Sequence, residues 1–311
     1  MSKLTIDEQM RCVYAALQRL KYGRSTVDIA GELGVSRFMV GRMVQRARDE
    51  GLVEVRSVMA DPIDAELSHV LADRYGLSAA YAVLAPVGGG RQIRSALASV
   101  CARLLVDAIE EDDIVGMTPG RTIIEMCERL ESLPMCDVVQ LTGVASTDEG
   151  EILRAITAMT SAVRGKIHSL HAPMLATDAT AGRAIAAQPA VRRALARMDA
   201  LDRAIVTIGG WPDASLLAAQ ADQLGEMERL VGRGIVAEIG TTLLDAQGTA
   251  VPALEGRTIG ISEQQLRSTP QITAVGGGPG KERAVLAVAR SGYADVLVTD
   301  AATARFLLDH S

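Results

Sequence analysis

Three basic side chains that follow runs of glycine could hold an anion together. Arg91, Arg121 and Lys281 each come directly after a glycine-rich segment. Glycine lets backbone amides approach an anion closely, and a helix that begins at such a loop adds partial positive charge. This pattern predicts a phosphate held by guanidinium, ammonium and amide groups. The hydroxyls of the same ligand would need acceptors, for which the candidates are Glu238, Asp245 and Asp300.

Each of these loops alone is weak evidence, because glycine-rich turns also serve as ordinary connections. The last loop is not a nucleotide-binding P-loop: its GxxxGK spacing is one residue short, and Glu282 stands where a magnesium-binding Ser or Thr is needed. We therefore expect no metal and no cofactor. The candidate ligand-binding residues are Gly89, Gly90, Arg91, Gly116, Thr118, Gly120, Arg121, Thr122, Gly143, Gly209, Gly210, Glu238, Lys281 and Asp300.

A second group of basic residues lies near the start of the chain, within residues 37–48. Arginines and a glutamine recur there on one helical face, and no acidic residue interrupts them. Arginine matches the edge of guanine and glutamine that of adenine, so such a helix suits the major groove of DNA. The alternative is a basic amphipathic helix on an ordinary helical bundle. The candidate DNA-binding residues are Ser25, Thr26, Ser36, Arg37, Phe38, Gly41, Arg42, Gln45 and Arg46.

The elements around this helix are typical of a helix-turn-helix. Apolar residues at helical spacing predict a first helix over residues 5–20. Ser25 or Thr26 can cap a short second helix, Gly34 can make a tight turn, and Ser36 can cap the third. Residues 52–56 alternate like a short strand that could form a wing. A further helix over 61–76 carries an apolar stripe that either packs on the rest of the chain or pairs with a second copy, and we favour pairing.

The remainder of the chain alternates between short apolar runs and helical segments. Strands are expected at 80–84, 113–117, 137–141, 167–171, 204–208, 235–239, 258–261, 272–275 and 295–298. Helices are expected at 91–109, 121–130, 152–163, 189–198, 281–290 and 301–308. This alternation predicts a doubly wound, mainly parallel α/β domain whose ligand lies at the carboxyl ends of the strands. We expect a DNA-binding domain at 1–57, a linking or oligomerisation helix at 58–76 and an effector domain at 77–311.

The distribution of charge agrees with this division. The chain of 311 residues has a net charge of −6, but residues 1–57 carry +3 and the rest −9. A basic head can meet phosphates while an acidic body stays away from them. No apolar segment near the start resembles a secretory signal and none is long enough for a membrane span, and four cysteines without CxxC spacing are typical of cytoplasmic thiols.

Over nearly its whole length the chain resembles the SorC family of bacterial sugar-responsive regulators. The matching residues are 29–30, 33–37, 40, 42, 47–48 and 51–53, then 115–116, 120–122, 141–143, 172–173, 208–209, 248, 273–275, 281 and 295–300. Two departures stand out. Ala237-Glu238-Ile239 replaces the usual Gly-Asp-Ile, which leaves the identity of the ligand open. Gly41-Arg42 replaces the common Ser-Arg, which leaves the operator sequence open.

The resemblance implies a winged helix-turn-helix joined to a domain similar to glucosamine-6-phosphate deaminase and ribose-5-phosphate isomerase. It also implies a homodimer or homotetramer, control by a phosphorylated sugar or polyol, and operator DNA with palindromic half-sites, most simply as a repressor. One alternative is a sugar-phosphate isomerase or deaminase with an accessory head, for which His168, His171 and Glu238 are candidate acid–base groups. Another is an architectural DNA binder whose large domain only oligomerises.

Overall fold

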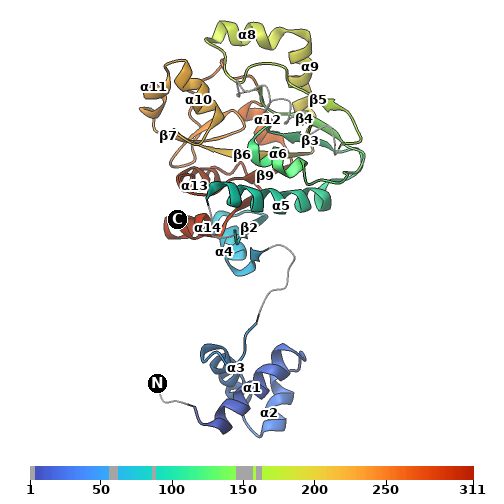
Figure 1. The fold of residues 1–311 in the computed structure, drawn as a ribbon, viewed down its shortest axis with the longest axis vertical. Coiled ribbons are helices and arrows are strands. Elements are labelled where there is room, and N and C mark those ends of the chain that lie inside the picture. Colours follow the sequence, from blue (N-terminus) through green and yellow to red (C-terminus); the bar gives the residue numbers. More distant parts are fainter. Residues whose placement is uncertain (1–3, 56–61, 86–88, 145–156, 159–162) are drawn as a thin grey trace. The chain divides into compact units, whose positions relative to one another are not determined.

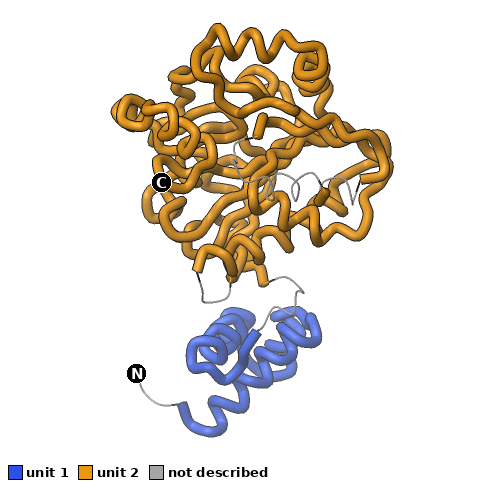
Figure 2. The backbone as a smooth tube through the Cα atoms, turned by 45° about the horizontal axis from the view of Figure 1, so that its top comes forward, with its two compact units in different colours: residues 1–60 blue, residues 61–311 orange. Residues whose placement is uncertain are grey.

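The chain forms two compact units, residues 1–60 and residues 61–311 (Figure 2). A computed structural model describes residues 4–55, 62–85, 89–144, 157–158 and 163–311. We call the first unit the head and the second the effector unit, and describe each by itself.

The head contains three helices whose starts follow the sequence closely. They are α1 (Ile6–Leu20), α2 (Thr26–Leu33) and α3 (Arg37–Asp49). Ser25 and Ser36 cap α2 and α3 by accepting a hydrogen bond from a backbone amide three residues on. Gly34 ends α2 with φ +65°, a conformation that costs glycine little. The predicted arrangement of the three helices is confirmed.

The core of the head is built from small residues on one side of α1. Cys12 and Ala16 on α1 pack against Ala47 on α3. The apolar stripe that predicts α1 lies on a different side, and its first members, Ile6 and Met10, are exposed. The wing strand is not formed within residues 52–55, because Leu52 and Val53 both turn inward beneath α3 instead of alternating. Residue 56 lies outside the described residues.

The effector unit is organised around a mainly parallel sheet (Figure 1). Its order is β1-β2-β10-β9-β6-β3-β4-β5, with β7 joined to β6 and β8 to β7. In this spatial order, all adjacent strands between β2 and β5 are parallel to each other. By contrast, β1 pairs antiparallel with β2, β7 with β6 and β8 with β7. The strands are β1 (Ile63–Asp64), β2 (Ala79–Val83), β3 (Ile114–Met117), β4 (Asp137–Gln140), β5 (Ile167–His168), β6 (Arg203–Gly210), β7 (Ile235–Ile239), β8 (Thr242–Asp245), β9 (Gln271–Val275) and β10 (Val296–Asp300).

Alternating residues of the strands fill two cores on opposite faces of the sheet. On β6, Ala204, Val206 and Ile208 face one core and Ile205 faces the other. Because successive strand side chains point to opposite faces, the core strands are mainly apolar between their polar ends. The side with Ile205 is covered by α5 (Gly90–Ala108) and α6 (Arg121–Cys127).

Several helices cover the other face, and a smaller lobe stands beside the sheet. Those packed in the first core are α4 (Ala65–Tyr75), α9 (Pro189–Arg197), α12 (Glu263–Ser268), α13 (Glu282–Ser291) and α14 (Ala301–Asp309). The lobe has its own apolar cluster formed by α10 (Leu216–Gln223), α11 (Met227–Val231), β7 and β8. The remaining described helices are α8 (Ala179–Ala187) and the short 3₁₀ turn Met198–Ala200.

The helix expected to link the domains belongs to the effector unit. Leu71 of α4 is fully buried in the core of that unit. Ser68 donates a hydrogen bond to the carbonyl of Asp64 (2.6 Å) and accepts one from the amide of Ala82 (2.9 Å), which ties α4 to β2. The chain itself thus covers Leu71 of this stripe, while Val70 stays exposed, and pairing with a second copy stays a prediction.

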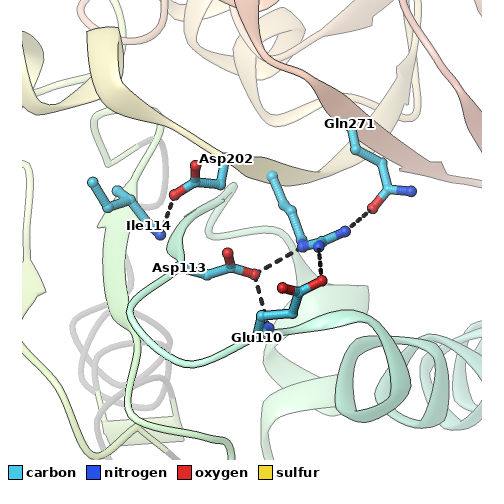
Figure 3. Close-up of polar contacts among 6 residues, drawn as sticks. Glu110, Asp113, Ile114, Asp202 and Gln271 are labelled. Atoms are coloured by element: carbon cyan, nitrogen blue, oxygen red, sulfur yellow. Dashed lines mark hydrogen bonds and ion pairs between the residues drawn. The ribbon is translucent and has the colours of Figure 1, made fainter.

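A polar network fastens the amino ends of three neighbouring strands (Figure 3). Arg203 at the start of β6 contacts Asp113 before β3 (2.8 Å), Glu110 (3.4 Å) and Gln271 at the start of β9. Asp202 accepts a hydrogen bond from the amide of Ile114 (2.8 Å). These contacts lie at the edge of the sheet opposite the carboxyl ends of the strands.

Some sequence-based boundaries differ from the structure. Residues 258–261 form isolated bridges with Thr142 and Leu175 and not a strand, because they lie against loops and not against the edge of the sheet. β8 was not expected from the sequence, and it returns as a hairpin from β7. The helix expected at 152–163 falls largely outside the described residues.

Candidate DNA-binding surface and ligand pocket

The predicted DNA-binding side chains of the head lie on the outer face of α3. Val40 and Ala47 are buried under the helix. The candidate residues on the outer side are all exposed: Ser36, Arg37, Phe38, Gly41, Arg42, Gln45 and Arg46. This face therefore presents guanidinium groups, an amide and an aromatic ring to solvent.

Contacts on this face are few and local. The Arg37 guanidinium lies 5.0 Å from the centre of the Phe38 ring, and Gln45 Nε2 donates a hydrogen bond to Asp49 Oδ1 (2.8 Å). Ser25 serves as the cap of α2, and the half-buried Thr26 is its first residue. Surface contacts of this kind are weak, so the basic face can exchange them for contacts with nucleic acid.

The ligand pocket of the effector unit lies at the carboxyl ends of β3, β4, β6 and β9. Its volume is about 260 Å³. From β3 the chain proceeds outward through β4 to β5, whereas β6, β9 and β10 follow on the other side of β3. The direction of strand order therefore reverses between β3 and β6, and open α/β sheets bind ligands at such a reversal. The fold thus places the pocket where sequence reasoning placed it.

Two threonines form the floor of the pocket between β3 and β6. Thr118 Oγ1 accepts a hydrogen bond from the amide of Thr207 (2.9 Å) and lies 3.2 Å from its hydroxyl. The loop after β3 passes so close to β6 that a Cβ on Gly120 would lie 2.6 Å from Thr207 Cγ2. Glycine is needed at residue 120 because the two strand ends approach each other there.

A buried carboxylate forms one wall. Glu238 on β7 accepts hydrogen bonds at Oε2 from Trp211 Nε1 (2.7 Å) and from the Ser215 hydroxyl (2.6 Å). We find no hydrogen bond to its other oxygen, Oε1, from the residues described. Burial raises the pKa of Glu238, while the bonds from Ser215 and Trp211 and the charge of Lys281 act against that increase. The second oxygen is therefore available to a ligand hydroxyl.

Three basic side chains also line the pocket. Lys281 Nζ donates to the carbonyl of Ile208 (2.8 Å), and its burial lowers the pKa of the ammonium, which Glu238 partly offsets. Arg94 is held by Glu125 at 2.6 Å. Arg121 makes no hydrogen bond or ion pair within the described part of the chain. A pocket lined by three cationic side chains and one buried carboxylate favours an anionic ligand.

The structure brings most of the predicted residues together, but not all. Those that line the pocket are Gly90, Thr118, Gly120, Arg121, Thr122, Gly143, Gly209, Glu238 and Lys281. Those that do not are Gly89, Arg91, Gly116, Gly210 and Asp300. Glycines 89, 116 and 210 adjoin the lining loops without facing the cavity. Asp245 also lies outside, where it accepts amide hydrogen bonds in the hairpin after β8.

Two of the corrections have clear physical reasons. Asp300 caps α14 and accepts hydrogen bonds from the amide of Gly278 (2.7 Å) and the hydroxyl of Thr303 (2.7 Å), so it positions the glycine loop instead of meeting the ligand. On α5 the pocket-facing side carries Gly90, Arg94 and Leu97, at the spacing of one helical face. Arg91 therefore points elsewhere, and Arg94 takes its place.

Sequence reasoning missed several polar residues of the pocket: Arg94, Gln140, Thr142, Thr207 and Ser215. A signal existed for Arg94, which lies four residues after Gly90 on an amphipathic helix. Gln140 is a polar residue at the end of an otherwise apolar strand, which also could have marked it. Ser215 had no such signal, since it comes from the lobe beside the sheet.

The two histidines considered for catalysis do not reach this pocket. His168 Nε2 lies 3.2 Å from Asp137 Oδ2, and His171 lines the same separate depression beside α9. Among the described residues, no group of His, Cys, Asp and Glu side chains could hold a metal ion. The residues that line the pocket accordingly include one buried acid, Glu238, and no histidine.

Within the described residues, no helix has both the length and the apolar character needed to cross a membrane.

Known proteins are similar in sequence to the effector unit and to nearly the whole chain. Residues 63–309 match the Sugar-bind family, described as a sugar-binding domain. The chain belongs to this family. The deoxyribonucleoside regulator of Bacillus subtilis is 27% identical and covers 97% of this chain and 98% of its own length. The uncharacterized transcriptional regulator YjhU of Escherichia coli K12 is 28% identical over 92% of this chain and 90% of its own length.

The full-length sorbitol operon regulator SorC of Klebsiella pneumoniae has a similar structure. The TM-score is 0.70 at 23% identity, with 97% of this chain and 99% of that chain covered. The predicted resemblance to SorC regulators and the α/β fold are thereby confirmed. Together with the regulators among its relatives, the matching sugar-binding domain identifies this chain as a transcriptional regulator.

Proposed function

We propose that the head binds operator DNA through α3 and that a phosphorylated sugar or polyol in the β3–β6 pocket controls this binding. The observation that carries the proposal is a pocket lined by three cationic side chains together with a buried carboxylate. The phosphate of the ligand lies against Arg121, Lys281 and Arg94, and a hydroxyl donates to Glu238 Oε1. The regulator acts as a homodimer or homotetramer on palindromic half-sites and most simply represses.

The charges of the pocket support a phosphate in particular. Lys281 Nζ uses one donor on the carbonyl of Ile208, which leaves two for a ligand. The guanidinium of Arg121 is unpaired among the described residues and can contact two phosphate oxygens at once. Burial disfavours the charge of Lys281. A bound dianion would relieve that penalty, whereas an uncharged sugar would not.

The ligand is tested by thermal unfolding of the full chain with a panel of sugar phosphates and their unphosphorylated counterparts. A ligand at 100 times its dissociation constant stabilises by about 2.7 kcal/mol. We expect stabilisation only by phosphorylated compounds, and its loss in Arg121→Ala. Arg91→Ala is the matched control, since that arginine follows a similar loop but lies outside the pocket. A panel in which no phosphorylated compound stabilises the protein would refute this assignment.

The control of DNA binding is tested by measuring operator affinity with and without the stabilising ligand. We expect the ligand to change the affinity of the wild type and to leave that of Lys281→Met unchanged, because the two sites are coupled only through a filled pocket. Operator affinity should also fall steeply with salt, since arginines on α3 displace counterions from phosphates. Salt-insensitive binding would contradict contact through this face.

A further inference from the structure

The first helix of the head has an exposed apolar stripe that its own fold does not cover. The exposed fractions are 81% for Ile6, 66% for Met10, 39% for Leu17 and 44% for Leu20. Val13, between them, is half-buried. The head core is instead formed by the opposite side of α1, through Cys12, Ala15 and Ala16. This helix therefore has two apolar sides, of which only one is used within the head.

The spacing of the stripe is that of a coiled-coil seam. Its members are separated by four, three, four and three residues in turn: Ile6, Met10, Val13, Leu17 and Leu20. This alternation is the a/d repeat by which one helix packs against a similar helix, over two heptads. A face that packs only on an irregular surface has no need of such a strict repeat. The pattern therefore indicates a partner helix of the same kind.

The charges at the two ends of the stripe favour an antiparallel orientation. Asp7 and Glu8 lie in the first turn of α1, whereas Arg19 and Lys21 lie at its end. Asp7 and Lys21 both occupy e positions, which face g positions in a parallel pair, so Lys21 would face the uncharged Ala16 and form no ion pair. In an antiparallel pair each Asp7 faces a Lys21, and the negative end of each helix dipole lies beside the positive end of the other.

We propose that α1 of one chain pairs antiparallel with α1 of a second copy, so that the heads are joined by this seam. The pairing is self-complementary about a twofold axis near Val13: Met10 lies opposite Leu17 of the second copy, and Ile6 lies opposite Leu20. This inference names the contact between heads in the proposed regulator. Two heptads are short for an independent coiled coil, so the seam acts within the full chain.

Cysteine cross-linking in the full-length protein tests the arrangement without DNA or ligand. Val13→Cys should form a disulfide dimer under mild oxidation, because the two residues lie on the axis. Met10→Cys alone should not, since the two copies of residue 10 are seven residues apart along the axis, or roughly 10 Å, beyond disulfide reach. A mixture of Met10→Cys and Leu17→Cys chains should cross-link only between the two variants. Wild type, with its four buried cysteines, is the background.

Charge reversal in the Val13→Cys background tests the orientation independently. Asp7→Lys or Lys21→Asp alone should slow cross-linking about 2- to 10-fold, and the two together should restore it. Cross-linking of Met10→Cys alone would show a parallel pair and overturn the proposal. A Val13→Cys variant that stays monomeric would also overturn the proposal. This holds whether the thiol of residue 13 reacts with an alkylating reagent or is covered by another part of the chain. Because neither readout involves DNA, this result is separate from the fate of the proposed function.

Discussion

Replacing Ser215 by alanine should destabilise the effector unit through two hydrogen bonds at once. Its hydroxyl oxygen accepts a bond from the amide of Ala218 (2.9 Å), which caps α10, and its hydrogen is donated to the buried Glu238 (2.6 Å). Loss of a cap costs about 1 kcal/mol and loss of a bond to a charged group about 1.5–3 kcal/mol. We therefore expect a decrease of about 2.5–4 kcal/mol in the free energy of unfolding at pH 8.

Ser262→Ala provides the matched control. Ser262 caps α12 by the same kind of bond, to the amide of Gln265 (3.2 Å), but has no carboxylate partner. Its removal should cost only about 1 kcal/mol. Urea unfolding followed by the fluorescence of Trp211, the single tryptophan of the chain, reports on the lobe that contains both Ser215 and Glu238. The two variants can thus be compared in one assay.

The excess cost in Ser215→Ala should depend on pH. Burial already raises the pKa of Glu238 above its ordinary 4.5, and losing the Ser215 bond raises it further. The pKa of Glu238 is higher in the folded state than in the unfolded state, so ionisation of Glu238 opposes folding. This loss of stability is complete at a pH above the folded-state pKa, and it disappears as the pH falls toward the unfolded-state pKa. The difference between the two variants should be largest at pH 8 and shrink toward pH 5. Equal destabilisation by Ser215→Ala and Ser262→Ala at pH 8 would refute this account of the carboxylate.

Three further predictions concern other parts of the molecule. Arg42→Ala should weaken operator binding by about 1–3 kcal/mol in a fluorescence anisotropy titration, while circular dichroism shows the head still folded. Gly248→Ala should lower the free energy of unfolding by about 1–3 kcal/mol, because φ is +83° and a Cβ would lie 2.7 Å from the carbonyl of Ala287. Leu71→Ala should cost about 2–5 kcal/mol, whereas the exposed Val70→Ala on the same helix should cost under about 0.5 kcal/mol. Equal losses for this last pair in urea unfolding would mean that α4 does not pack on the effector unit.

Local patterns predicted much of the fold. Ser25 and Ser36 marked helix starts because a hydroxyl there satisfies a free amide, and Gly34 marked the turn between them. The parallel strands could be predicted because burial on both faces makes most of their residues apolar. The pocket followed from the rule that strand ends meet at one edge of such a sheet.

What the sequence could not predict depends on contacts between distant segments. The apolar stripe of residues 61–76 has the same sequence pattern whether it packs on a second copy or on its own chain. Only the fold shows that Leu71 is buried within the chain. The sequence did not show which way the Arg91 side chain points, because that depends on the residue at which α5 begins. Asp300 looked like a ligand acceptor because its four internal hydrogen bonds come from Gly278 and from α14, which sequence alone does not bring together.

Because of the network around Arg203, the residues that hold the strands together differ from the residues that line the pocket. This network anchors β3, β6 and β9 at their amino ends, while recognition uses side chains at the far ends of the same strands. Residues that choose the ligand can therefore be exchanged without loosening the attachment of the strands to one another. Engineering a sensor for a new metabolite would accordingly vary pocket residues such as Arg121 and Thr122, and keep Arg203 and its partners fixed.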